Sequence, residues 1–125
     1  MAIEFDELSN RVIKCALEVH SQLGPGLLEV TYEQCLAYEM RAAEIPFELQ
    51  KPLPVRYKSV LLDCGHRLDV VVANQLIVEL KSVDALLPLH EAQLLTYLKL
   101  SGIHIGLLIN FNTPHLRDGI KRRVL

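Results

Sequence analysis

The chain has 125 residues, half of them hydrophobic and 22% charged, and its formal net charge is −2. This composition favours one soluble globular domain over residues 1–125 and argues against binding to nucleic acid through bulk charge alone. No apolar run is long enough to span a bilayer and the acidic N-terminus lacks a secretion signal, so we expect a cytoplasmic protein that is not in a membrane. The 3 cysteines form no CxxC pair, which favours reduced thiols over disulfides or zinc ligands.

Two amphipathic helices are predicted at the start of the chain. Apolar residues recur at steps of three and four over residues 5–23, and the glycines of GPG at residues 24–26 end this helix. A second helix is predicted over residues 27–43. Its apolar stripe consists of Leu28, Tyr32, Cys35 and Leu36.

The middle of the chain changes to a strand pattern. Residues 47–83 are rich in Val and Leu and predict two or three antiparallel strands, the first at a sheet edge because it contains Pro52 and Pro54. A helix is predicted over residues 88–101, a buried central strand over residues 103–110, and a short basic helix or tail at the end. A β-α-β connection favours a parallel pair of strands, so the sheet is expected to be mixed.

A hairpin is predicted within residues 66–81. A loop of Ala73-Asn74-Gln75 places six aliphatic side chains on one face, whereas a loop with an even residue count would bury charge. That register sets Asp69 opposite Glu79. The six aliphatic residues are Leu68, Val70, Val72, Leu76, Val78 and Leu80.

Two interpretations of the Asp69 and Glu79 carboxylates stay open at this point. One is a solvated checkerboard in which Arg67 and Lys81 neutralise the acids, because surface ion pairs contribute little and persist without a function. The other is a divalent metal site, because Mg²⁺ prefers the oxygens of carboxylates, water and phosphate. Lys81, two residues after Glu79, would then orient a water molecule or help to deprotonate it.

Four short motifs resemble those of a nuclease family. Asp69 followed by ELK at residues 79–81 resembles the signature of the PD-(D/E)xK nuclease superfamily, although a leucine precedes Asp69 where the superfamily's name has proline. GLLEVTY at residues 26–32 resembles its small bacterial branch, the GxxExxY proteins. HEAQLLTYL at residues 90–98 is similar to the QxxxY motif of RecB-like members, and GLLINF at residues 106–111 continues the match.

This resemblance implies a fold, an activity and a set of site residues. The fold would be α/β, a single-domain α/β/α sandwich with a mixed four-stranded sheet and a restriction-endonuclease-like core. The activity would be hydrolysis of phosphodiester bonds of DNA or RNA by in-line attack of water, with Mg²⁺ or Mn²⁺ as the cofactor. The metal ligands would be Asp69, Glu79 and Glu29, and the catalytic residues would include Lys81 and Gln93.

Other residues are weaker candidates for the site. Tyr97, on the same face of its helix as the catalytic glutamine, is a candidate for contact with a base or a phosphate. Tyr32 and Asn110 are further candidates for contact with the substrate, the latter because α/β sheets bind ligands at the carboxyl ends of strands. Glu33, one helical turn after Glu29, is an alternative metal ligand.

The scarcity of basic residues limits how this chain could bind nucleic acid. Only the C-terminus is basic, and its cations form either a solvated face or a phosphate-binding group: Arg117, Lys121, Arg122 and Arg123. A nuclease of this size without a wider basic surface would need a homodimer, a partner protein or a narrow substrate such as a single strand. The alternatives are a catalytically inactive nucleic-acid-binding or assembly module on the same scaffold, and a sugar-phosphate or nucleotide hydrolase that uses the same site and would act on small phosphodiesters.

Overall fold

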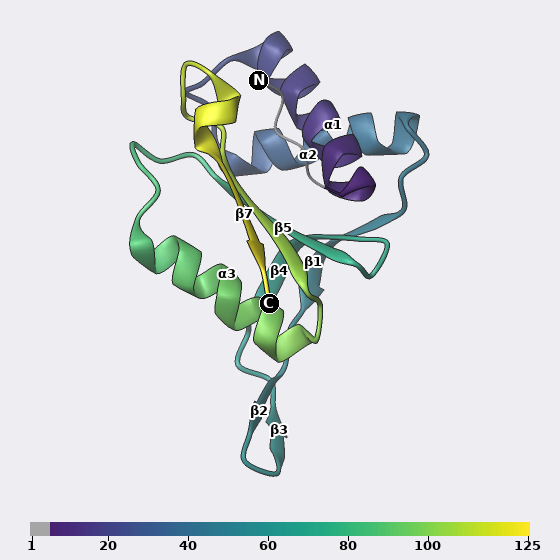
Figure 1. Cartoon of the computed structure of the whole chain (residues 1–125), viewed down its shortest axis with the longest axis vertical. Helices are drawn as coiled ribbons and strands as arrows, with labels where there is room; N and C mark the ends of the chain where they lie inside the picture. The colour runs from purple at the N-terminus through teal and green to yellow at the C-terminus, as the bar shows by residue number, and fades with distance from the viewer. Residues whose placement is uncertain (1–5) are drawn as a thin grey trace.

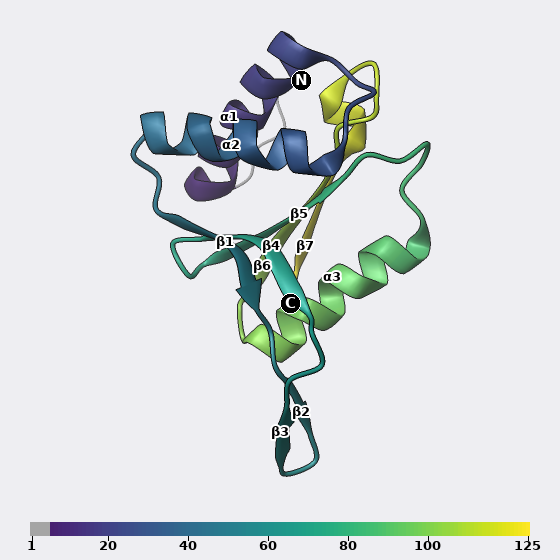
Figure 2. The same ribbon diagram turned by 180° about the vertical axis from the view of Figure 1, so that it is seen from behind.

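The computed structural model describes residues 6–125 and places helices on both faces of a sheet (Figures 1 and 2). The main sheet has five strands in the order β1-β4-β5-β6-β7, and β2 and β3 form a separate two-stranded sheet. Within these residues no helix has the length and apolar character needed to cross a membrane. The elements are α1 (Glu7–Leu23), α2 (Glu29–Ala42), β1 (Phe47–Pro52), β2 (Val55–Tyr57), β3 (Val60–Leu62), β4 (Arg67–Val72), β5 (Leu76–Lys81), α3 (Pro88–Ser101), β6 (Ile105–Asn110), the 3-10 helix η1 (Leu116–Gly119) and β7 (Ile120–Val124).

The predicted helices are confirmed, with changes at their ends. α1 ends at Gly24, whose φ of 68° lies in the region that favours glycine. The predicted start of this helix at Phe5 lies outside the described residues. The assignment of Leu28 to an apolar helical stripe is wrong, because this residue is the N-cap of α2 and its side chain is 73% exposed.

The mixed sheet is confirmed, but it has more strands than predicted. β5 and β6 are parallel and the other neighbouring strands are antiparallel, with β1 at one edge. Residues 120–124 form β7 beside β6 instead of a basic helix or tail. An edge strand has one side open to water and therefore tolerates charged side chains, which explains why a basic segment can form a strand here.

The hairpin of β2 and β3 extends away from both helical layers (Figures 1 and 2). Its presence means that residues 47–83 contain five strands rather than two or three. The side chains of Tyr57, Val60, Leu61 and Leu62 are all exposed. Because the hairpin contributes no residue to either core cluster, it adds little buried apolar surface to the fold.

Two apolar clusters lie on the two faces of the main sheet. One joins α1 and α2 to the sheet, and the other joins α3 to the opposite face through Val71, Ile77 and Leu108. β6 is buried from Gly106 to Asn110, as expected for a central strand. A Cβ atom at Gly106 would lie 2.7 Å from Leu94 Cδ1, so this glycine lets α3 pack closely on β6.

The predicted register of the β4–β5 hairpin is confirmed. Val70 pairs with Val78 and Val72 pairs with Leu76, which leaves residues 73–75 as the loop. The aliphatic residues predicted to share a face do so from Val70 onwards and lie in the cluster beneath α1 and α2.

Leu68 is the exception, and its predicted position on that face is wrong. Its side chain packs in the cluster of α3. The regular alternation of β4 is broken at Asp69, because the β1–β4 ladder omits the pair between Asp69 and Gln50. Gln50 has a φ of 51°, which ordinary strand geometry does not accommodate. This irregularity sits beside the residues that the sequence assigns to the site.

Candidate functional site

Asp69 and Glu79 face each other where β4 and β5 separate. The ladder between the two strands ends at the pair of Val70 and Val78. Beyond it the Asp69 N–H donates to Glu79 Oε2 at 2.8 Å, and the Leu80 N–H donates to Asp69 Oδ2 at 2.9 Å. Each carboxylate therefore accepts a hydrogen bond from the backbone of the other strand, in place of a ladder bond. We call these two residues the acid pair.

The acid pair is not a solvated checkerboard. The Glu79 side chain is only 4% exposed, whereas Arg67 is exposed. Burial, followed by the negative charge of Asp69, raises the pKa of Glu79 to about 8, and the positive charge of Lys81 acts in the opposite direction. No ion pair within residues 6–125 includes either member of the pair. Two carboxylates held together in this way favour a bound proton or a bound cation.

A pocket of about 330 Å³ opens beside the acid pair on the side of α2. It is lined by Glu29, Val30, Glu33, Gln50, Asp69 and Leu80, and we call it the acid pocket. The Gln50 amide donates to Glu33 Oε1 at 2.6 Å and lies 3.4 Å from Asp69 Oδ1. Burial raises the pKa of Glu33, and the charge of Asp69 acts in the same direction. Sequence reasoning missed Gln50, since a glutamine in a predicted edge strand carries no signal of a site.

The donor atoms at this site fit a hard divalent cation. Carboxylate oxygens are the ligands that Mg²⁺ prefers, and it commonly needs only one or two from the protein because water and phosphate complete its shell. No group of three or more His, Cys, Asp or Glu side chains suited to holding a metal ion occurs among residues 6–125. Glu29 lines the acid pocket as an exposed residue of the first turn of α2, and Glu33 is the buried one, linked to Asp69 through Gln50. The structure thus sets Asp69 and Glu79 side by side and brings Glu29 into the pocket that Asp69 lines.

A second pocket of about 450 Å³ lies on the side of α3, and we call it the donor pocket. Its polar lining consists of His66, Lys81, His90, Gln93, Thr96 and Tyr97. The Gln93 amide donates to Tyr97 Oη at 3.2 Å, so these residues lie together, as their spacing predicts. Burial raises the pKa of Tyr97, and the negative charges of Glu79 and Asp69 act in the same direction. Tyr97 lines this pocket together with Lys81, which follows Glu79 by two residues on β5.

His66 lines the donor pocket from the position just before β4. It precedes the first residue of β4, so the alternation of that strand does not apply to it. Its side chain is exposed, and Nδ1 lies 3.3 Å from Tyr97 Oη. The two rings make an edge contact with centroids 5.8 Å apart.

Two predicted substrate contacts, Tyr32 and Asn110, hold backbone segments in place in this structure. Tyr32 is fully buried and stacks on Phe111, and its hydroxyl bonds two backbone groups of the loop at residues 24–27. Asn110 is 2% exposed, and its amide both donates to the Val83 carbonyl and accepts from the Val83 N–H. The polar atoms of both side chains bond the backbone, and contact of either residue with a substrate stays a prediction.

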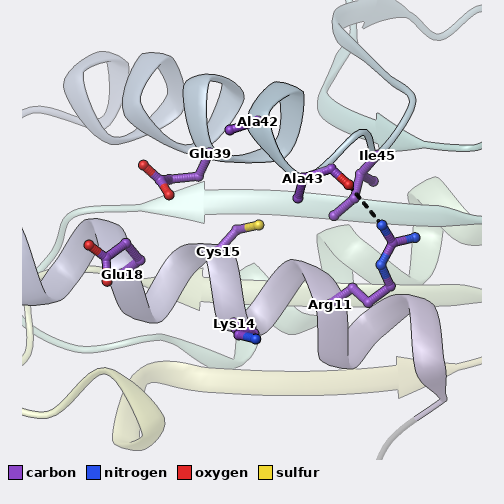
Figure 3. Close-up of a pocket in the computed structure, with 8 residues that line it drawn as sticks. All are labelled: Arg11, Lys14, Cys15, Glu18, Glu39, Ala42, Ala43 and Ile45. Atoms are coloured by element: carbon purple, nitrogen blue, oxygen red, sulfur yellow. Dashed lines mark hydrogen bonds between the residues drawn. The ribbon is translucent and has the colours of Figure 1, made fainter.

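A groove between α1 and α2 is a separate hollow of about 460 Å³ (Figure 3). Cys15 points from α1 into the space between the two helices, and the Arg11 guanidinium donates to the Ala43 carbonyl. Burial raises the pKa of the Cys15 thiol, and the charge of Glu39 acts in the same direction. A thiol in this state is a poor nucleophile, so the groove carries no evident chemistry.

The basic C-terminus is largely engaged within the molecule. Arg122 pairs with Asp6 Oδ1 at 3.0 Å, and Arg123 pairs with Glu91 of α3. Two of the four predicted phosphate-binding cations therefore hold β7 to its neighbours. Arg122 and Arg123 thus help to hold the edge strand β7 in the fold.

Comparison with known proteins gives a family that agrees with this geometry. A family model described as the PD-(D/E)XK nuclease superfamily matches residues 6–123. Neither the curated proteins nor the solved structures gave a match. The mixed sheet with helices on both faces is consistent with the restriction-endonuclease-like fold, with five strands in place of four. The chain belongs to the PD-(D/E)XK nuclease superfamily.

Proposed function

We propose that the protein is a metal-dependent nuclease of the GxxExxY branch that hydrolyses phosphodiester bonds of DNA or RNA, with residues 1–125 as one nuclease-like domain. The observation that carries the proposal is the acid pair. Asp69 and Glu79 are held together by crossed hydrogen bonds to backbone, one of them is buried with a raised pKa, and Lys81 follows on the same strand. A structural salt-bridge network would instead pair these carboxylates with cations.

Asp69 and Glu79 would hold Mg²⁺ or Mn²⁺, with Glu33 and Glu29 nearby in the acid pocket. The bound ion would lower the pKa of a water molecule and neutralise charge on the phosphate oxygens. The crossed hydrogen bonds fix both carboxylates before the substrate arrives, so little free energy is needed to order them. Gln50, which contacts both Glu33 and Asp69, would keep the acid pocket in this arrangement.

Lys81 and Gln93 would act on the attacking water and the phosphate. The water oxygen forms a bond to phosphorus as the bond to the leaving oxygen, on the opposite side, breaks. The Lys81 ammonium would hold the water in line and stabilise negative charge that develops on the phosphate. Gln93 would position the water or the nucleic acid from α3, where its amide is already fixed by the Tyr97 hydroxyl. A second copy of the chain or a partner protein would enlarge the surface that contacts the nucleic acid.

The test is a calorimetric titration of Mn²⁺ into the wild type, into Asp69→Asn and into Asp84→Asn, each with and without a short oligonucleotide. Asp84 is exposed and lines neither of the two pockets at the acid pair, so its variant is the matched control. We expect binding by the wild type and the control, and loss of binding by Asp69→Asn. Equal binding by all three proteins, or no binding even with oligonucleotide, would refute the proposed metal site.

A cleavage screen with single-stranded and double-stranded DNA and RNA then tests the activity. We expect Mn²⁺-dependent cleavage that Lys81→Met abolishes without loss of Mn²⁺ binding. Metal binding without cleavage of any of these substrates would instead favour the catalytically inactive binding module.

A further inference from the structure

The donor pocket differs in chemistry from the acid pocket across the sheet. The acid pocket contains the carboxylates of Glu29, Glu33 and Asp69. The lining of the donor pocket contains no Asp or Glu, and its polar groups are one ammonium, two imidazoles, one amide and two hydroxyls. Lys81, which belongs to the donor pocket, follows Glu79 by two residues. The acid pocket therefore offers carboxylate oxygens, and the donor pocket offers N–H and O–H donors.

The hydrogen bonds of His90 determine which of its ring nitrogens faces a ligand. The Leu87 N–H donates to His90 Nδ1 at 3.0 Å, where α3 begins. A neutral imidazole carries one proton, so a ring that accepts at Nδ1 carries its proton on Nε2. His90 therefore presents an N–H donor at Nε2.

A chain of hydrogen bonds favours the same tautomer for His66. The Gln93 amide donates to Tyr97 Oη at 3.2 Å, and the same oxygen lies 3.3 Å from His66 Nδ1. The Tyr97 side chain is only 7% exposed, and His66 Nδ1 lies within hydrogen-bond reach of its hydroxyl. When Nδ1 accepts the hydroxyl proton, the imidazole carries its own proton on Nε2. Both histidines thus present N–H donors, next to the Lys81 ammonium.

We propose that the donor pocket binds a phosphate group of the nucleic acid, next to the phosphate at the acid pair, with His66 and His90 as ligands. This inference rests on the proposed nuclease function and adds a second point of contact with the substrate. A lining of N–H and O–H donors with one fixed positive charge suits a phosphate, which only accepts hydrogen bonds. The volume of about 450 Å³ lies in the range of pockets that bind small ligands, so it can take a phosphate with its sugar.

The phosphate in this pocket has two possible origins in a nucleic acid. It is either an internal phosphodiester of a strand that continues past the acid pair or the terminal phosphate of a strand end. The two origins share the chemistry that the pocket recognises, and they differ in whether a strand must end there. A dinucleotide with and without a terminal phosphate distinguishes them.

The experiment is an NMR titration of the histidine ring resonances, without metal, with a dinucleoside monophosphate and with its 5′-phosphorylated form. We expect saturable shifts of the His66 and His90 rings, while the ring of exposed His115 stays unchanged. Shifts with both ligands would assign the pocket to an internal phosphodiester, and shifts with the phosphorylated form alone would assign it to a terminal phosphate. Absence of shifts with either ligand, or equal shifts of His115, would overturn the proposal.

Two variants give an independent readout of affinity. His66→Ala is expected to weaken binding of the dinucleotide that shifts the rings by roughly tenfold, because a hydrogen bond to a charged group is lost. His115→Ala is the matched control and is expected to bind as the wild type does. Since His66 is exposed, its loss should not disturb folding, which circular dichroism can check. Unchanged affinity of His66→Ala would refute the assignment.

Failure of this proposal is distinguishable from failure of the proposed function. The titration uses no metal and measures no cleavage. A protein that binds Mn²⁺ and cleaves nucleic acid, yet shows no ring shifts, would retain the nuclease function and lose only the phosphate subsite.

Discussion

Substitution of Glu79 by glutamine should remove most of the decline in the protein's stability between about pH 5 and 8. In the folded protein burial and the charge of Asp69 raise the pKa of Glu79 from 4.5 to about 8. The folded state therefore binds more protons than the unfolded state between these two values, and the free energy of unfolding falls as the pH rises. Glutamine keeps an oxygen that can accept from the Asp69 N–H but removes the titrating charge.

The magnitude follows from the size of the shift. One pKa unit corresponds to about 1.4 kcal/mol, so the wild type should lose roughly 4 kcal/mol of stability between pH 5 and 8. The stabilising contribution is fully present below the unfolded pKa and is lost as the pH rises through the folded one. The raised pKa of Glu33 acts in the same direction and adds a smaller slope that Glu79→Gln retains.

Urea unfolding of both proteins at several pH values, without metal, measures this slope. We expect a steep decline for the wild type, a shallow one for Glu79→Gln, and an intermediate one for Asp69→Asn, which removes only the second cause of the shift. Added Mn²⁺ should raise the stability of the wild type near pH 8, because it replaces the proton between the carboxylates. A wild-type stability that is flat with pH, or a slope that Glu79→Gln leaves unchanged, would refute the reasoning.

Two further substitutions test the packing around the site. Gly119→Ala should destabilise the fold by about 2 kcal/mol or more in urea unfolding. The new Cβ would overlap the backbone carbonyl oxygen of Asn110, which cannot move aside easily. A destabilisation well below about 1 kcal/mol would contradict this reasoning. Tyr32→Phe should cost about 1–2 kcal/mol through the loss of its hydrogen bonds to the loop at residues 24–27, whereas Tyr38→Phe, at an exposed position, should cost almost nothing. Equal effects of the two tyrosine variants would argue against the buried role of the first.

The local pattern of the sequence was enough to predict the helices and the register of the hairpin. Apolar spacing and the glycines of GPG gave α1 and its end, and the requirement to bury Val70 and Val78 on one face gave the loop at residues 73–75. The same register placed Asp69 beside Glu79. The helices and the hairpin depend on residues that are near one another in the chain. For the hairpin, only one register buries the aliphatic side chains on a single face.

The details of the site were decided by contacts between distant segments. Gln50 reaches Glu33 from β1, and His66 reaches Tyr97 from the connection between β3 and β4. Neither contact leaves a local pattern in the sequence. The position of Asn110 at the end of β6 predicted contact with a ligand, and only the tertiary structure shows that its amide bonds the backbone at Val83.

The sequence by itself determined the nuclease family, the helices and the pairing of the two carboxylates, because motif order and hydrophobic periodicity are properties of the chain. Only the tertiary structure decided that Glu79 is buried, that Leu68 turns towards α3 and that residues 120–124 add a strand to the sheet. Burial, the charge around a group and the partners of an edge strand depend on what packs against them. Those neighbours are chosen by the whole fold.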